Sequence, residues 1–156
     1  MKNELEKATF AAGCFWQVQN IFDRIPGVIS SVVGYIGGVG IPDYETAEAK
    51  GYAETIEISF DPKIINYGEL LKVFWKEHDP TSLNQQGADI GKRYRSAIFY
   101  HNVKQKRQAL KSKEKLQEIT KRLIVTEIVF AEKFYPAEKY HQKYIVKKNH
   151  YFLTKI

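Results

Sequence analysis

The sequence predicts an α+β fold, in which helices pack on one face of a mixed β-sheet. Short β-rich or apolar runs alternate along the chain with segments whose apolar residues recur at helical spacing. Their order is roughly β-α-β-β-α-β-α-β, which is typical of a two-layer domain. The chain has 156 residues, 44% of them hydrophobic and 27% charged, which is ordinary for a globular domain of this size. We therefore expect a single domain over residues 1–156.

The first third of the chain begins with an apolar run over residues 8–13, which fits a buried strand ending in glycine. The helix expected over residues 15–24 follows at once and is closed by a Pro-Gly pair. Two further strands are expected, one over the β-rich residues 28–35 and one over the alternating residues 55–60. On the second of these, three apolar side chains share one buried face: Ile56, Ile58 and Phe60.

The next helix is expected over residues 66–78. Asn66 fits its N-cap, and Glu69 three residues later completes a capping pattern. Its apolar residues recur at helical spacing and predict one buried stripe, formed by Leu70, Leu71, Phe74 and Trp75.

In the last third of the chain, a strand over residues 95–100 precedes a polar helix over 103–120 and a strand over 124–130. The tail over residues 136–156 is aromatic and basic, and we expect it to be part helix and part coil. We also expect its aromatic side chains to pack over the site and the sheet: Phe134, Tyr135, Tyr140, Tyr144, Tyr151 and Phe152.

Composition excludes several classes of protein. No run of about 18 apolar residues exists, the first residues lack a signal-peptide core, and one cysteine cannot form an internal disulfide scaffold. These features favour a cytoplasmic protein that does not enter a membrane.

The net charge of +6 is concentrated in residues 101–156, which carry 14 Lys and Arg against 5 Asp and Glu. A module that binds nucleic acid or an acidic partner is one hypothesis for this third of the chain. The lysines are scattered and no nucleic-acid motif accompanies them, so we expect a solvated helix surface and no nucleic-acid partner.

The lone cysteine, Cys14, falls where the first strand turns into the first helix. Free backbone N–H groups and the helix dipole favour a thiolate there, although a lone thiol can also be a small buried hydrophobe. Two long glycine-rich loops, over residues 37–44 and 84–95, are of a length that is usually functional. If both loops fold over Cys14, the thiol meets carboxyl and phenol groups. That set suits attack on a polar, oxygen-bearing electrophile.

An ordered series of motifs runs through almost the whole chain. It includes Gly13-Cys14-Phe15-Trp16, Gly34-Tyr35 with Gly37-Gly38, Ala53-Glu54, His78-Asp79-Pro80-Thr81, Tyr94-Arg95-Ser96 and Phe134-Tyr135-Pro136-Ala137-Glu138. This series closely resembles the A-type peptide methionine sulfoxide reductases, over residues 7–145. The resemblance implies a ferredoxin-like two-layer sandwich with long catalytic loops.

The resemblance also implies a role for each of seven residues. Cys14 would attack the sulfoxide sulfur and become a sulfenic acid, while Glu54 would protonate the sulfoxide oxygen. Phe15 and Trp16 would hold the methyl group of the substrate and leave only the S epimer correctly placed. The phenol groups of Tyr44 and Tyr94 would hydrogen-bond the oxygen, and the carboxylate of Asp89 would order the polar site.

The chain departs from the family pattern in several places. Gln17, Gln19 and Tyr52 stand where glycine, glutamate and histidine are usual, and no resolving cysteine follows Cys14. Because one sulfur cannot bridge to itself, the sulfenic acid must be reduced by an outside thiol. Thioredoxin, glutaredoxin with glutathione, or a small dithiol would serve. No metal or organic cofactor is expected, since the histidines, among them His78, His141 and His150, lack zinc-like spacing.

Free or protein-bound methionine-S-sulfoxide would be the substrate, and we expect a monomer. Two other classes remain as alternatives: the nucleic-acid or acidic-partner module, and a peroxidase that uses the same thiol. Binding by such a module would survive the loss of Cys14, whereas the activity of a peroxidase would not need Glu54 as an acid.

Overall fold

The computed structural model describes residues 4–154, and side chains from residue 4 to residue 150. The strands in this part are β1 (Glu6–Ala12), β2 (Val28–Ile36), β3 (Ala53–Phe60), β4 (Gln85–Gln86), β5 (Asp89–Ile90), β6 (Ser96–Tyr100), β7 (Glu127–Phe130) and β8 (Tyr135–Pro136). The helices are α1 (Phe15–Phe22), α2 (Tyr67–Lys76), α3 (Val103–Glu118) and α4 (Tyr144–Thr154), with 3₁₀ turns η1 (Lys92–Tyr94) and η2 (Lys139–His141).

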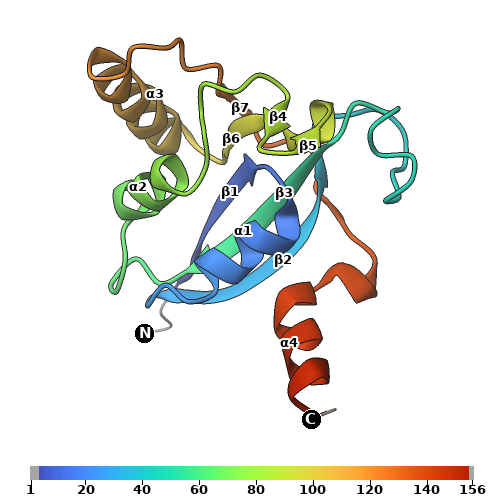
Figure 1. Ribbon diagram of the computed structural model, residues 1–156. Coiled ribbons are helices and arrows are strands. Elements are labelled where there is room, and N and C mark those ends of the chain that lie inside the picture. The colour runs from blue at the N-terminus through green and yellow to red at the C-terminus, as the bar shows by residue number, and fades with distance from the viewer. Residues whose placement is uncertain (1–3, 155–156) are drawn as a thin grey trace.

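The main sheet has the strand order β7-β6-β1-β3-β2-β8. Its neighbours are antiparallel except for β6 and β7, which run parallel, so the predicted mixed sheet is confirmed. The four central strands and the helices α1 and α2 form the β-α-β-β-α-β arrangement of a ferredoxin-like sandwich. Figure 1 shows α1 lying across the central strands, α2 and α3 next to each other at the upper left, and α4 extending from the body at the lower right.

The core lies between the sheet and its helices. Phe10 on β1 stands at its centre, with ring centroids 5.6 Å from Phe22, 6.1 Å from Tyr67 and 5.0 Å from Phe74. The alternating face predicted on β3 is buried there: Ile56, Ile58 and Phe60. Burial of each large apolar side chain stabilises the fold by about 1.5–3 kcal/mol. This packing holds β1 and β3 in place; β1 ends, and β3 begins, at the site described below.

Sequence patterns placed the long elements to within two residues at most ends, and differences concentrate at the short elements. The strand expected over 124–130 begins only at Glu127, because the backbone N–H groups of Ile124 and Val125 donate to Gln117 Oε1 and to the carbonyl of Pro80. The two-residue strands β4, β5 and β8 are too short to give a periodic signal.

The N-cap predicted at Asn66 is confirmed, since its side chain accepts a 2.8 Å hydrogen bond from the Glu69 N–H. Of the predicted stripe, Leu70, Leu71 and Phe74 are buried, and Trp75 is partly buried.

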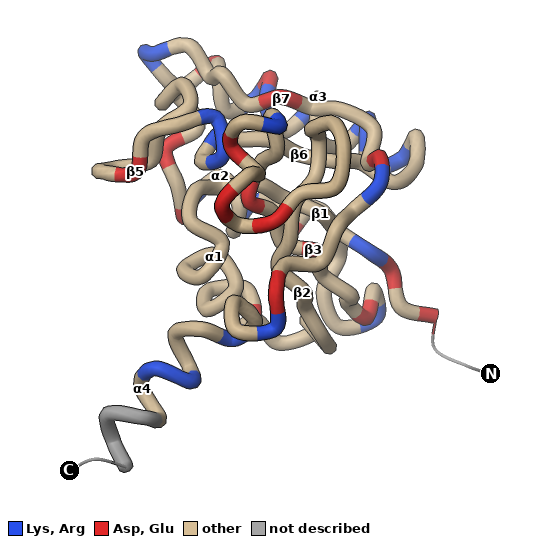
Figure 2. Tube along the Cα trace, turned by 90° about the vertical axis from the view of Figure 1, so that its right-hand side faces the viewer, with Lys and Arg blue, Asp and Glu red and all other residues tan. Residues whose placement is uncertain are grey.

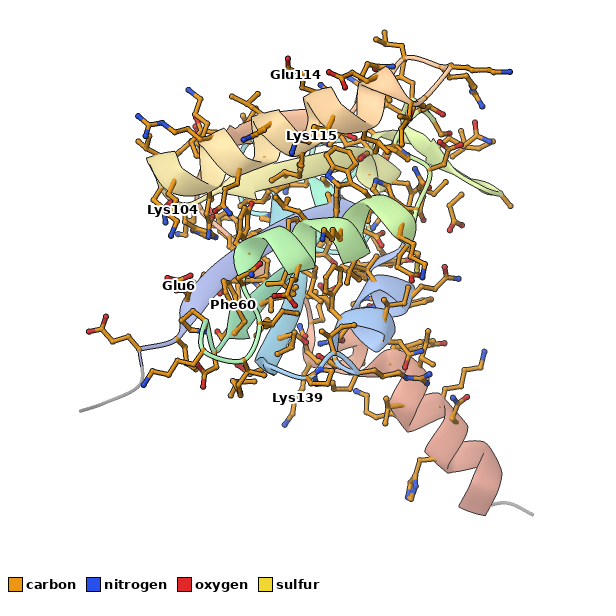
Figure 3. The ribbon with its side chains drawn as sticks, turned by 90° about the vertical axis from the view of Figure 1, so that its left-hand side faces the viewer. Glu6, Phe60, Lys104, Glu114, Lys115 and Lys139 are labelled. Atoms are coloured by element: carbon orange, nitrogen blue, oxygen red, sulfur yellow. The ribbon has the colours of Figure 1, made fainter. Side chains whose placement is uncertain are left out.

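The polar helix α3 carries its charges toward solvent. Figure 3 labels three of these exposed residues: Lys104, Glu114 and Lys115. The described part of α4 likewise carries lysine and no acidic residue (Figure 2). No helix within residues 4–154 is long and apolar enough to span a membrane.

His78 links the end of α2 to the sheet. Its Nδ1 lies 2.6 Å from the Phe74 carbonyl, so Nδ1 carries a proton and donates it. Its Nε2 lies 2.7 Å from Ser96 Oγ, which in turn lies 2.7 Å from Thr126 Oγ1. A neutral ring, which accepts from Ser96 at Nε2, completes this chain of hydrogen bonds. Burial accordingly lowers the pKa of His78 to about 4.

Stability should therefore fall as the pH drops from about 6.5 toward 4. The unfolded chain binds a proton at His78 in this range and the folded chain does not. This difference lowers the free energy of unfolding by up to about 3 kcal/mol. Urea unfolding at a series of pH values measures the slope of the free energy of unfolding against pH. His78→Gln should remove most of it, whereas His150→Gln, at an exposed position, should keep it. An equal slope in both variants would contradict the assignment.

Candidate active site

Cys14 sits at the N-cap of α1, as the sequence predicted. Gly13 makes the turn from β1 with a φ of +94°, and the Cys14 carbonyl accepts from the N–H groups of Gln17 and Val18, each at 3.2 Å. A side chain at position 13 would meet the Gln86 side chain at 2.9 Å, so the loop that carries β4 folds over this turn. The thiol is partly buried beneath that loop.

The environment of the Cys14 thiol contains opposing influences. Burial raises the pKa of Cys14, and the Glu54 and Asp89 carboxylates raise it further, while backbone N–H groups of Trp16 and Gln17 lower it. The net direction is upward. The helix-terminal N–H groups expected from the sequence are present, but burial and the neighbouring charges outweigh them. The resting site therefore favours a thiol, and neutralising Glu54 would favour the thiolate.

Glu54 lies beside this turn. It is the second residue of β3, is only 2% exposed, and its Oε1 accepts a 3.2 Å hydrogen bond from the N–H of Phe15. Its Oε2 lies 2.7 Å from Nε of Arg93. Burial raises the pKa of Glu54 and Asp89 adds to this, whereas Arg93 and the Phe15 N–H lower it. A carboxyl with a raised pKa stands next to the only cysteine.

Tyr44 and Tyr94 approach the same carboxylate from two loops. The Arg93 guanidinium carbon lies 4.4 Å from the Tyr44 ring centroid and 5.9 Å from that of Tyr94. Burial and the charge of Glu54 raise the pKa of Tyr94 to about 12 and also raise that of Tyr44. Both phenols therefore keep their protons at neutral pH and can donate hydrogen bonds.

Asp89 lies on β5, in the loop that covers Cys14. Its carboxylate raises the pKa of Cys14, Glu54 and Tyr94, which places it within electrostatic reach of all three. The polar residues predicted for the site are thus gathered around one strand-to-helix turn.

Phe15 and Trp16 form the aromatic side of the site at different depths. Phe15 is 1% exposed, with its ring centroid 5.8 Å from Tyr35 and 6.5 Å from Tyr44. Trp16 is partly buried, its Nε1–H donates to His141 Nδ1 at 2.9 Å, and its ring stacks on Tyr144 at 3.9 Å. Phe15 is therefore the deeply buried aromatic residue beside Cys14, and Trp16 the more accessible one.

The C-terminal segment 137–144, which contacts Trp16, is hydrogen-bonded to the body of the domain. Glu138 accepts from the Tyr35 hydroxyl at 3.0 Å and from the Tyr44 N–H at 3.2 Å. Gln142 exchanges two hydrogen bonds with the backbone of Val33, at 2.9 and 2.8 Å. The predicted aromatic packing is confirmed for Phe134, Tyr135 and Tyr144. It is wrong for Tyr140, which is 59% exposed because its ring lies on His141 at the surface. The side chains of Tyr151 and Phe152 lie outside the described residues.

The three residues that depart from the family pattern, Gln17, Gln19 and Tyr52, lie around the site rather than in it. Gln17 is exposed, whereas Gln19 is buried and accepts from the Lys143 N–H at 2.7 Å, tying the C-terminal segment to α1. Tyr52 is buried, and its hydroxyl donates to the Gly40 carbonyl in the first glycine-rich loop.

Sequence reasoning missed Arg93 and Glu48. Glu48 accepts from the N–H groups of Lys92 and Arg93, each at 2.9 Å, and thereby fixes η1. Arg93 lies inside the loop predicted to be functional, but a single charged residue in a loop carries no signal that it faces a buried carboxylate.

Metal ligation finds no support among residues 4–154, since no group of three or more His, Cys, Asp or Glu side chains is placed to hold an ion. The expectation that no metal or cofactor is needed stays a prediction.

Comparisons with known proteins point to the same family that the sequence motifs resemble. The sequence model of the family described as "Peptide methionine sulfoxide reductase" matches residues 6–156. The peptide methionine sulfoxide reductase MsrA of Methanosarcina acetivorans is 54% identical over 149 residues, covering 92% of this chain and 79% of that protein. Reduced Mxr1 from Saccharomyces cerevisiae has a TM-score of 0.88 at 32% identity, covering 94% of this chain and 87% of that one. Mxr1 in complex with Trx2 has a TM-score of 0.67 at 28% identity, covering 92% and 89%.

Proposed function

Because the chain belongs to the peptide methionine sulfoxide reductase family and is therefore an oxidoreductase, we propose that it reduces methionine-S-sulfoxide through a sulfenic acid on Cys14. One observation carries this proposal. A carboxyl group whose pKa is raised by burial accepts a hydrogen bond from the residue that follows the lone cysteine, at 3.2 Å. The proposed acid thus lies at the strand-to-helix turn that carries the proposed nucleophile.

In the first step, the Cys14 sulfur attacks the sulfoxide sulfur while Glu54 places a proton on the sulfoxide oxygen. A sulfur–sulfur bond forms, and the oxygen takes a second proton from solvent and leaves as water, because a protonated oxygen leaves far more readily than a bare one. Water then adds to the Cys14 sulfur and loses a proton, and the sulfur–sulfur bond breaks to release the thioether. The net change is Cys14–SH plus sulfoxide to Cys14–SOH plus thioether. The thiol is oxidised and the substrate sulfur is reduced.

The aromatic and phenolic groups would set the stereochemistry. Phe15 and Trp16 offer an apolar surface that suits the substrate methyl group, and Tyr44 and Tyr94 keep hydroxyl protons to donate to the oxygen. Asp89 would order the polar side. With methyl and oxygen fixed on opposite sides, only the S epimer points its sulfur at Cys14.

Regeneration needs an outside thiol. An external thiol condenses with Cys14–SOH to a mixed disulfide and water, and a second thiol then releases Cys14–SH and a new disulfide. The structure of Mxr1 in complex with Trx2 supports a thioredoxin as this partner. Glutaredoxin with glutathione or a small dithiol would perform the same exchange.

We further propose that residues 7–145 form the catalytic core of one monomeric, cytoplasmic domain, with residues 136–156 as its basic, aromatic tail. Free and protein-bound methionine-S-sulfoxide would both be substrates. No nucleic acid or membrane takes part in this reaction.

A single-turnover assay tests the proposal. Reduced protein mixed with a methionine-S-sulfoxide peptide, without reductant, should form about one methionine per chain and leave a trappable sulfenic acid on Cys14. The matched peptide of the R epimer serves as the control and should give none. Equal turnover of both epimers would refute the stereochemical assignment. Fast consumption of peroxide with no methionine formed would favour a peroxidase instead.

A further inference from the structure

A buried ion pair joins Glu54 to Arg93. The Nε of Arg93 lies 2.7 Å from Oε2 of Glu54, and the two side chains are only 13% and 1% exposed. Charge-assisted hydrogen bonds of this kind are strong, and removing one partner leaves a buried charge uncompensated. Arg93 therefore stabilises the carboxylate form of the proposed acid, against the burial that raises its pKa.

Arg93 is itself held at several points. A second guanidinium nitrogen donates to the Tyr44 carbonyl at 2.8 Å, and the guanidinium lies over the Tyr44 ring. Its backbone N–H donates to Glu48 Oε2 at 2.9 Å. Glu48 is in turn packed against Gly91, where any added Cβ would meet a carboxylate oxygen at 2.5 Å. Both the side chain and the backbone of Arg93 are thus held by hydrogen bonds.

We propose, on the basis of the function assigned to Glu54 above, that Arg93 is a positioning residue for sulfoxide reduction. It holds Glu54 against the backbone of Phe15 before the reaction, and it stabilises the carboxylate that Glu54 becomes again when its proton is on the substrate oxygen. Arg93 needs no contact with the substrate for this role.

Arg93 is the one cation among the groups that act on this carboxylate in the described structure. The titratable and charged groups around Glu54 are Cys14, Tyr35, Tyr44, Asp89, Arg93 and Tyr94. Arg93 lowers the pKa of Glu54, whereas burial and Asp89 raise it. Without Arg93 only the hydrogen bond from Phe15 opposes burial, so Glu54 should take up its proton at a higher pH.

The pH profile of the first step reports this proton. The step needs the Cys14 thiolate together with protonated Glu54, and an ordinary carboxyl titrates roughly four units below a thiol. Below the Glu54 pKa the rate rises with pH as the thiolate forms. Above the Glu54 pKa, each gain in thiolate is offset by an equal loss of protonated Glu54, so the rate becomes independent of pH. The break on the acidic side therefore marks the Glu54 pKa.

Single-turnover rates with the S-epimer peptide, measured from about pH 4 to pH 9, provide the test. In Arg93→Gln the acidic break should move up by about one unit, since a neighbouring cation shifts a carboxyl by roughly one to three units. Arg93→Lys keeps the charge without the Nε geometry and should give a smaller upward shift. Lys92→Gln is the matched control, because it removes one positive charge from an exposed position of η1. Its break should stay at the wild-type pH.

An acidic break in Arg93→Gln that coincides with that of the active wild-type protein would overturn the proposal. If circular dichroism shows that Arg93→Gln does not fold, Arg93→Lys decides, and an unmoved break there has the same meaning. A wild-type protein that forms no methionine at any pH would instead refute the proposed function, so the two failures are distinguishable.

Discussion

Replacing Cys14 with serine should abolish methionine formation, with a loss on the order of 10⁴-fold or more. A serine hydroxyl at this position fits the same space but has no accessible anion and cannot form a sulfenic acid. The chain has no second cysteine that could take over. Methionine formed per chain, measured with an excess of dithiol, gives the result.

The control for this variant is its fold. Cys14 is only partly buried, so Cys14→Ser should keep the wild-type circular dichroism spectrum and a similar unfolding midpoint. Residual turnover above a few per cent in a folded Cys14→Ser protein would show that another group attacks the sulfoxide. The sulfenic acid assignment would then be wrong.

Replacing Glu54 with glutamine should have two effects of opposite sign. The first chemical step should slow by about 10²–10⁴-fold, because glutamine cannot protonate the sulfoxide oxygen. At the same time, the charge of Glu54 that raises the pKa of Cys14 is removed. The thiol should then react faster with iodoacetamide at neutral pH, while it reduces sulfoxide more slowly.

Glu57→Gln on the same strand is the matched control. Glu57 pairs with Lys7 at 3.3 Å, away from Cys14, and a surface pair of this kind contributes little to stability. Neither rate should change by more than about twofold. If Glu54→Gln left the rate of sulfoxide reduction within about twofold of the wild-type rate, Glu54 would not act as the acid.

Much of the fold was readable from local pattern. The alternation over residues 55–60 identified the buried face of β3, and Asn66 with Glu69 marked the start of α2. Both signals depend on side chains close in sequence, which report the local backbone. The two-residue strands carry too few residues for such a signal, and the start of β7 depends on partners in α3 and at Pro80.

The candidate site likewise contains some residues that the sequence identified and others that it did not. Motif order singled out Cys14, Glu54 and Tyr94, and the structure gathers them around one turn. Arg93 and Glu48 escaped notice, since each is an ordinary charged loop residue until the fold brings it to its partner. Their separations from those partners along the chain, 39 and 45 residues, lie far beyond any local pattern.

The amino-acid sequence alone determined that Cys14 is the one thiol and cannot form a disulfide within this sequence, because counting cysteines needs no coordinates. The proposed sulfenic acid would therefore need an outside thiol. Only the tertiary structure decided the protonation balance of the site. Burial raises the pKa of both Cys14 and Glu54, and at Glu54 the positive charge of Arg93 opposes this rise. Desolvation and the distance between charges exist only once the chain is packed, so no sequence pattern encodes them directly.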